Sequence, residues 1–433
     1  MQSVPRCIRL PTKLSSMVIP MLNRSLHIWA AILLAIAPAQ CFAFTYFKRT
    51  TLPTNYLVYD PISDMIYASV PSSAGALRGN TITAINPHTG FLGTSVFISS
   101  EPSVLALADD GSRVYAASES TNLVTPFNLS TMTSGTPFVI GSGNRRVDDM
   151  EVAPGAPTVL AVSRSFGGNN VGIAIFADGV KLPNEQSDSA INDVIEFGDN
   201  ANTLYGHENS VSDFDFNSFS IDTTPTGGIT SGYQSKYLLT QFGLDMEYES
   251  GRMYFTNGQI LEVTTPGPIG SFTANGPVEP VGSVGRTYFV QGTKLKSFSQ
   301  ATFVPLGEIT IPGMIGTAKN LISLGDNGLA FATTSGQIII ARGSLVKGPT
   351  ADFDADGDVD GQDFIAWQAG VGKDTALRAD GDSNGDGIAN AEDLAFWKQQ
   401  FGKPATTVAS VPEPNSVALA VYMLTLASRF RRS

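Results

Sequence analysis

The chain has 433 residues, a formal net charge of −12 at pH 7 and 15% charged residues. This acidic balance, without a basic patch, argues against nucleic acid as a partner. The two cysteines, Cys7 and Cys41, both precede a predicted cleavage point before Phe44, so the mature protein is expected to contain no disulfide. Its stability must therefore come from buried apolar side chains and bound metal.

Residues 1–43 are predicted to be a signal peptide. Arg24 and His27 precede a short apolar run over residues 28–37, and Cys41-Phe42-Ala43 offers a small-x-Ala cleavage site. The apolar run is shorter than a comfortable transmembrane helix. We therefore expect an exported protein whose mature part begins at residue 44.

Residues 44–346 contain seven copies of a short strand with an apolar-aromatic pattern, each preceded by a turn and spaced about 34–49 residues apart. The third residue of each copy is Tyr67, Tyr115, Leu160, Tyr205, Tyr254, Tyr288 or Ala330. Further apolar strands lie before and after each copy. Four strands per repeat predict a mainly β fold, a seven-bladed β-propeller, with a pair of β-sandwiches as the alternative.

The segment over residues 80–90, a strand followed by the turn Thr89-Gly90, resembles the repeats of YVTN-type propellers. This resemblance implies the same fold and says nothing about function. A closed ring usually completes one blade with strands from both ends of the domain. We expect a segment within residues 44–54 to pair beside the last blade, near residues 321–346.

Three glutamates occupy corresponding places on the predicted inner strands of the third, fourth and fifth blades: Glu151, Glu196 and Glu247. Asp149 and Asp245 precede two of them by two residues, on the same strand face. Such side chains could line a channel and bind a cation or a sugar, or act as paired catalytic carboxylates in glycoside cleavage. The interpretation that we favour is that they accept hydrogen bonds from backbone amides between blades.

Other catalytic patterns are missing from the sequence. After the predicted cleavage point the histidines are His88 and His207, and both are expected to be surface or structural residues. The chain contains no phosphate loop, dinucleotide fingerprint or nucleophile elbow.

Two acidic segments near the C-terminus repeat each other at a distance of 30 residues and match the spacing of calcium loops. The candidate ligands are Asp352, Asp354, Asp356, Asp358, Asp360 and Asp363 in the first loop, and Asp382, Asn384, Asp386, Ile388, Asn390 and Asp393 in the second. Asp358 and Ile388 would contribute backbone carbonyls. The pattern predicts two bound Ca²⁺ ions, and an acidic disordered linker is the alternative.

Each loop is followed by a helical pattern, over residues 363–372 and 393–402, and each pattern ends in glycine. No helix-length segment precedes the first loop. This loop-then-helix duplication resembles a type I dockerin over residues 350–403, within a domain set at residues 347–404. The resemblance implies a small aromatic core of Phe364, Trp367, Trp397 and Phe401, and a cohesin-like module or the propeller itself as partner. Gly361-Gln362 and Ala391-Glu392 replace the Ser/Thr pairs that usually set partner choice.

Residues 405–433 form a linker and tail. Pro412-Glu413-Pro414 is followed by an apolar stretch and then by Arg429, Arg431 and Arg432. Residues 411–433 resemble a PEP-CTERM sorting signal, which implies processing by an exosortase-type enzyme and delivery to the envelope or extracellular matrix of a bacterium. A plain C-terminal anchor is the alternative.

Taken together, these features favour a secreted, envelope- or matrix-directed calcium-binding protein whose propeller binds a ligand or protein and whose dockerin-like module docks it. The alternative is an extracellular carbohydrate-active enzyme, a polysaccharide hydrolase or lyase attached through that module. The sequence contains no confirmed catalytic set, so binding is the favoured function.

Overall fold

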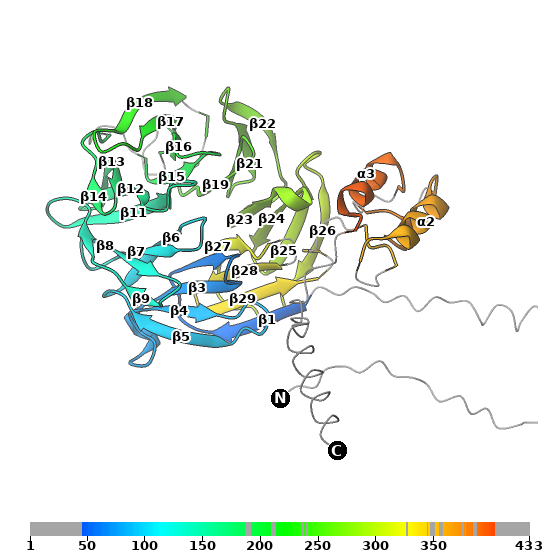
Figure 1. Ribbon diagram of the computed structural model, residues 1–433, viewed down its shortest axis with the longest axis horizontal. Helices are drawn as coiled ribbons and strands as arrows, with labels where there is room; N and C mark the ends of the chain where they lie inside the picture. The colour runs from blue at the N-terminus through cyan, green and yellow to red at the C-terminus, as the bar shows by residue number, and fades with distance from the viewer. Residues whose placement is uncertain are drawn as a thin grey trace, which may run out of the picture. The chain divides into compact units, whose positions relative to one another are not determined.

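The computed structural model describes residues 46–186, 192–208, 214–235, 238–239, 241–325, 328–343, 345–346, 351–354, 358–373, 376, 378–383 and 388–402. The predicted signal peptide, the predicted sorting tail and three candidate calcium ligands, Asp356, Asn384 and Asp386, lie outside these residues. The described part consists of antiparallel sheets up to residue 342 and two short helices from residue 361 onward (Figure 1).

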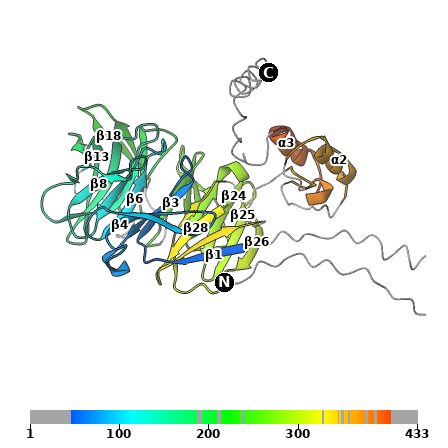
Figure 2. The same ribbon diagram turned by 60° about the horizontal axis from the view of Figure 1, so that its bottom comes forward.

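The strands form a seven-bladed β-propeller, as the sequence predicted (Figures 1 and 2). Each inner strand contacts the inner strands of both neighbouring blades, and the inner strand of the last blade contacts that of the first, so the ring is closed.

The blades are built as follows. Blade 1 is β2 (Tyr56–Asp60), β3 (Met65–Val70), β4 (Thr81–Ile85) and β5 (Leu92–Phe97), with the 3-10 turn η1 (Ser72–Ala74) after β3. Blade 2 is β6 (Pro102–Leu107), β7 (Arg113–Ser118), β8 (Leu123–Asn128), β9 (Thr133–Ser134) and β10 (Phe138–Val139). Blade 3 is β11 (Arg145–Val152), β12 (Val159–Phe166), β13 (Asn169–Ala177) and β14 (Val180–Lys181). Blade 4 is β15 (Val194–Phe197), β16 (Thr203–His207), β17 (Phe216–Asp222) and β18 (Gly228–Ser235). Blade 5 is β19 (Met246–Glu249), β20 (Arg252–Phe255), β21 (Gln259–Glu262) and β22 (Gly267–Ser271). Blade 6 is β23 (Val278–Val281), η2 (Gly282–Val284), β24 (Arg286–Gln291), β25 (Lys294–Ser299) and β26 (Pro305–Thr310). Blade 7 is β27 (Ala318–Ser323), β28 (Gly328–Thr333), β29 (Gln337–Arg342) and β1 (Tyr46–Thr51).

Neighbouring blades share their hydrophobic cores. In blade 1, Ile66 packs with Ile338 and Ile340 of blade 7, whereas the next residue, Tyr67, packs with Leu105 of blade 2. This alternation follows from the two-residue period of a strand. Each buried Leu, Ile or Phe contributes roughly 1.5–3 kcal/mol, so both faces of every sheet must be covered.

The third repeat copy is offset by one residue from the predicted alignment. Leu160 packs with Ala106 and Tyr115 of blade 2, while Ala161 packs with Leu204 of blade 4. Ala161, rather than Leu160, is therefore the structural equivalent of the tyrosines in the other copies. The alignment of the repeat copies did not reveal this offset, because the third copy lacks the tyrosine by which most of the other copies are aligned.

The predicted ring closure is confirmed. β1 pairs antiparallel with β29, from Tyr46 opposite Arg342 to Thr51 opposite Gln337, and it is the outermost strand of blade 7. Side chains of β1 also reach blade 1: Lys48 donates to the carbonyl of His88, and Thr50 Oγ1 donates to the carbonyl of Gly90 at 2.6 Å.

This register predicts the outcome of engineered cross-linking. Thr50 lies directly opposite Ile338, so the pair Thr50→Cys and Ile338→Cys should form a disulfide, seen as a mobility shift on a non-reducing gel. Closing so long a loop should also raise the melting temperature. The control pair Thr51→Cys and Ile338→Cys is one residue out of register and should not cross-link. Equal cross-linking of both pairs would contradict the register.

The C-terminal part contains α2 (Gly361–Gly370) and α3 (Ala391–Gln400), with the short turn η3 (Arg378–Asp380) between them. The two helices were predicted, but each begins two residues earlier than expected because the loop residue before it caps it. Asp360 and Asn390 accept hydrogen bonds from the backbone of Gln362 and Glu392. Among the described residues, no helix is long and apolar enough to cross a membrane.

Candidate functional site

The seven inner strands bring one equivalent side chain each to the centre of the propeller. These are the residues that pair with the tyrosines of five repeat copies and with their structural equivalents Ala161 and Ala330: Val58, Ala106, Glu151, Glu196, Glu247, Glu279 and Ile322. All seven line one cavity of about 440 Å³. Four consecutive blades thus contribute glutamates, which we call the glutamate arc, and the other three contribute aliphatic residues, which we call the apolar arc.

The structure brings the three predicted glutamates together and adds a fourth, Glu279, which sequence reasoning missed. The missed residue stands nine positions before Tyr288, as Glu196 stands nine positions before Tyr205. That spacing was a usable signal, but the intervening residues of blade 6 form a 3-10 turn rather than the Gly-Asp turn seen in other copies.

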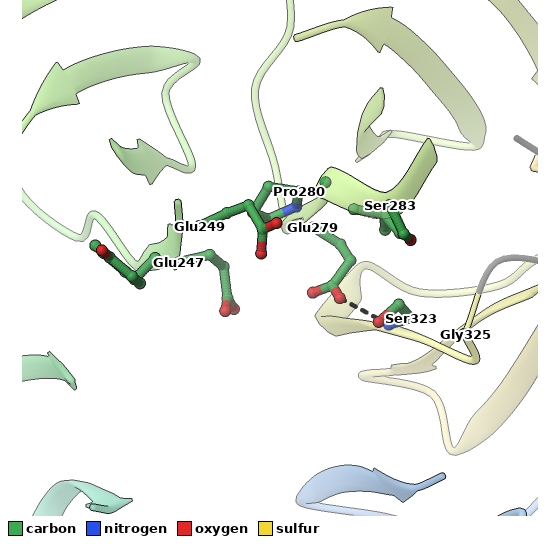
Figure 3. A pocket seen from close by; sticks show the side chains of 10 residues that line it. Glu247, Glu249, Glu279, Pro280, Ser283, Ser323 and Gly325 are labelled. Carbon is green, nitrogen blue, oxygen red and sulfur yellow. Dashed lines mark hydrogen bonds between the residues drawn. The ribbon is translucent and has the colours of Figure 1, made fainter. Parts of the chain in front are cut away.

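A second cavity of about 350 Å³ adjoins blades 5 to 7 and shares Glu247 and Glu279 with the first. Figure 3 shows these two side chains extending from neighbouring blades toward the same open space, with Glu279 bonded to Ser323. Glu249 also lines this cavity, and a Cβ added at Gly282 would lie 1.8 Å from its carboxylate. Glycine at position 282 is therefore what lets Glu249 approach the backbone of blade 6.

The acidic side chains fall into two classes by their hydrogen bonds. Asp149 accepts from the backbone of Ile195 in the next blade at 2.9 Å, and Glu279 accepts from the backbone of Ser323 at 2.9 Å. These two fit the favoured interpretation, in which acidic residues accept hydrogen bonds from backbone amides of a neighbouring blade. Within the described part of the chain, no hydrogen bond or ion pair involves the carboxylates of Glu151, Glu196 or Glu247. Among the described residues, the protein therefore supplies neither a cation nor a hydrogen-bond donor to these three carboxyls.

Burial and mutual repulsion shift these carboxyls toward the protonated form. Desolvation is the main cause for every member of the arc, and charge repulsion from neighbouring carboxylates adds to it. The pKa of Glu279 is raised to about 7, as is that of Asp149. The pKa values of Glu151, Glu196 and Glu247 are raised well above their ordinary value.

This arrangement predicts that replacing Glu279 by a neutral residue raises the free energy of unfolding, by an amount that depends on pH. A raised folded pKa means that the native state binds more protons than the unfolded chain, so its stability falls as the pH rises from about 4.5 through 7. Glu279→Gln keeps an oxygen for Ser323. It should raise the free energy of unfolding by up to about 3 kcal/mol at pH 8 and by almost nothing at pH 4, measured by urea denaturation.

Glu308 provides the control for this measurement. It is exposed and pairs with Lys294, which lowers its pKa. Glu308→Gln should therefore gain no stability at pH 8. An equal gain from Glu279→Gln at both pH values would indicate that charge in the channel is not the cause.

The two histidines behave as the sequence predicted. His88 is exposed in a turn and bonds to Asp64 through Nε2 at 2.6 Å. His207 ends β16, is fully buried, and lies with its ring edge-on to Phe255. Burial lowers the pKa of His207 to about 4.

A buried neutral histidine predicts acid sensitivity. Because the folded pKa of His207 is depressed from 6.5 to about 4, its contribution to stability is present above pH 6.5 and is lost as the pH falls to 4. The loss should approach about 3 kcal/mol. His207→Phe should flatten this part of the stability curve in urea denaturation at pH 4 to 7. If the free energy of unfolding of His207→Phe still fell with decreasing pH as in the unaltered protein, His207 would not be the cause of the acid sensitivity.

The first acidic loop brings most of its predicted ligands together. Carboxylate oxygens of Asp352, Asp354 and Asp363 lie within 4.8 Å of one another, as do those of Asp358, Asp360 and Asp363. Asp363 is fully buried and accepts hydrogen bonds from the backbone of Phe353 and Asp360. Carboxylate oxygens are the ligands that Ca²⁺ prefers, so these residues fit that ion.

The second loop repeats this geometry where it is described. Asp382 is buried, and Asp393 is fully buried and accepts from the backbone of Ser383 and Asn390, the counterparts of Phe353 and Asp360. The carbonyl of Ile388 accepts from Asn390 Nδ2 at 3.5 Å.

Two reciprocal hydrogen bonds connect the two loop-helix units of the C-terminal part. The indole of Trp367 donates to the carbonyl of Asn390 at 2.8 Å, and that of Trp397 donates to the carbonyl of Asp360 at 2.9 Å. The expected aromatic core needs correction. Phe364 contacts both tryptophans and Phe401 contacts Trp397, but Phe401 is 53% exposed. The buried apolar cluster beside the tryptophans consists instead of Ala351, Phe353 and Val359, from the first loop and the segment before it.

No protein-family model matches the chain, and no curated protein matches it. Solved structures do match its fold. The hydrazine synthase of Kuenenia stuttgartiensis aligns with a TM-score of 0.53 and 13% identity, covering 68% of this chain and 97% of that one. The β-propeller domain of Cps50 (Swd1) of Myceliophteria thermophila aligns with a TM-score of 0.53 and 10% identity, covering 69% of this chain and 99% of that one. U3-55K aligns with a TM-score of 0.50 and 10% identity, covering 68% of this chain and 98% of that one. At these identities the likeness shows the propeller fold alone.

Proposed function

We propose that this chain is an exported binding protein whose propeller takes a positively charged ligand into its central channel. The glutamate arc is the observation that carries this proposal. Three of its carboxyls have no partner among the described residues, and burial, with added repulsion between the carboxyls, holds their pKa values high. A bound cation would relieve both the repulsion and the missing hydrogen bonds.

A thermal-shift screen tests the proposal. Ligands that bind the native state raise its melting temperature. Cationic compounds should do so at pH 8, whereas uncharged and anionic compounds of similar size should not. The effect should weaken at pH 5, because protonation of the arc removes the attracting charge.

The double variant Glu196→Gln and Glu247→Gln should abolish these shifts, and Glu308→Gln, outside the channel, should retain them. Shifts with neutral or anionic ligands only would reject a cation-binding channel.

The same proposal assigns the C-terminal part to a calcium-folded docking module of the dockerin type. Asp352, Asp354, Asp358, Asp360 and Asp363 would hold one Ca²⁺, with Asp356 from outside the described residues. Asp382, the carbonyl of Ile388, Asn390 and Asp393 would hold the second, with Asn384 and Asp386. The ion would neutralise the clustered carboxylates and so link metal binding to folding. The buried apolar cluster of this module is small, so bound metal ions would be needed to stabilise its fold.

Tryptophan fluorescence gives a selective test of the calcium module. The three tryptophans are Trp29, Trp367 and Trp397, so after signal removal both remaining tryptophans report on this module. Adding Ca²⁺ to chelator-treated protein should shift their emission with a stoichiometry of two ions.

Asp363→Ala and Asp393→Ala should each remove one of the two ions. The matched control is Glu392→Ala, since Glu392 is exposed beside Asp393 and is not a predicted ligand. Identical emission with and without Ca²⁺ would end the assignment.

The proposed destination is the cell envelope or extracellular matrix. It rests on the predicted signal peptide over residues 1–43 and the PEP-CTERM-like tail over residues 411–433. A cohesin-like module, or the propeller itself, would then be the docking partner, and an exosortase-type enzyme would process the tail. Mass spectrometry of the exported protein tests both processing sites.

A second candidate function is polysaccharide cleavage. It is favoured by the raised pKa of Glu279, about 7, beside other carboxyls, because glycosidases pair a protonated acid with an ionised one. Incubation with a panel of polysaccharides should then release reducing ends or unsaturated products. Activity that survives Glu→Gln changes at residues 151, 196, 247 and 279 would exclude the arc as its source.

A further inference from the structure

The channel wall has two chemically different sides. The glutamate arc spans blades 3 to 6, and the apolar arc of Val58, Ala106 and Ile322 spans blades 7, 1 and 2. Leu105 and Leu107 of blade 2 extend the apolar side of the same cavity. A simple ion gains nothing from a hydrocarbon wall, whereas a molecule with a charged group and an apolar body can use both sides.

The neighbouring level of the channel adds an aromatic ring and an unpartnered acceptor. Tyr56 lies two residues before Val58, on the same strand face. Burial, and in addition the charge on Asp149, Asp245, Glu151 and Glu247, raises the pKa of Tyr56, so its hydroxyl stays protonated near these carboxyls. An aromatic face beside carboxylates is a favourable place for an organic cation.

Asn320 of β27 lies on the same cavity wall. Its Nδ2 donates to the carbonyl of Leu57 at 2.9 Å, which fixes the orientation of the amide. Its Oδ1 is buried and has no hydrogen-bond partner among the described residues. A buried acceptor without a donor destabilises the protein, so a ligand with N–H groups would satisfy it.

The spacing of the carboxylates argues against a directly coordinated metal in the channel. Among the residues that the structure describes, the sets of three acidic side chains with oxygens within 4.8 Å of one another lie in the first C-terminal loop, and none lies in the channel. Chelation of Ca²⁺ requires several oxygens within about 2.6 Å of the ion. The arc is too open for that, but it can accept hydrogen bonds from a larger cation.

We propose that the central channel binds a small organic ammonium ion, an amine with a hydrocarbon body, with its N–H groups on the glutamate arc and Asn320 and its carbon chain against the apolar arc and Tyr56. This inference rests on the proposed cation-binding function of the channel.

Calorimetry on the full mature chain tests the inference. Methylammonium, propylammonium and butylammonium carry the same charge, so their affinities should differ only through the apolar wall. Each added methylene should tighten binding roughly threefold to fourfold. 1,4-Diaminobutane should bind, and 1,4-butanediol, of the same length without charge, should not.

Variants locate the site. Glu196→Gln with Glu247→Gln should weaken 1,4-diaminobutane binding about tenfold or more, because two charged acceptors are lost. Tyr56→Leu should weaken it about threefold to tenfold. Glu308→Gln is the matched control and should bind like the wild type. The chain-length series is measured on unaltered protein, so it decides the question even where a variant fails to fold.

The outcomes separate the two levels of the proposal. Equal affinities along the chain-length series would overturn the inference and leave cation binding standing. The same follows if amines do not bind and the channel instead binds Mg²⁺ in a way that the double glutamine variant loses. No binding of any cation would overturn both.

Discussion

Packing between neighbouring blades is the interaction on which the rest of the structure depends. Each sheet buries one face against the blade before it and the other against the blade after it, as Ile66 and Tyr67 illustrate. The inner strands are thereby held side by side around one axis, and each contributes one side chain at each level of the channel. A single position per blade, repeated seven times, therefore decides whether the channel is charged or apolar.

The propeller can hold a cluster of buried acidic side chains without cationic partners because its stability resides elsewhere. The cores between blades contain long runs of fully buried Leu, Ile, Val and Phe, and they enclose the glutamate arc without supplying cations to it. Functional sites commonly break the rules that the surrounding fold obeys. The C-terminal module is built in the opposite way. Its apolar cluster is small, and buried acidic side chains, helix caps and reciprocal tryptophan bonds organise it.

Much of the fold was predictable because a period-two pattern and recurring turns are local features. The strand containing Tyr67, its six counterparts and the pairing of the first strand with the last blade all follow from such features. The offset at Ala161 was not predictable, because register depends on which neighbouring blade a side chain meets. Glu279 was missed because the 3-10 turn η2 replaces the turn that marks the repeat in other copies. The hydrogen bonds of Asp149 and Glu279 to neighbouring blades, and the opposite apolar arc, exist only once seven strands are placed around a common axis.

The pairing of β1 with β29 also constrains when the protein can fold. The two strands are separated by roughly 300 residues, so this contact has a very large sequence separation and a correspondingly slow loop closure. The strand β1 is made long before its partner β29 and must wait, unpaired, until the end of the last blade has been made. The ring therefore stays open on any partly synthesised chain and closes only when residues 337–342 are available to pair with β1.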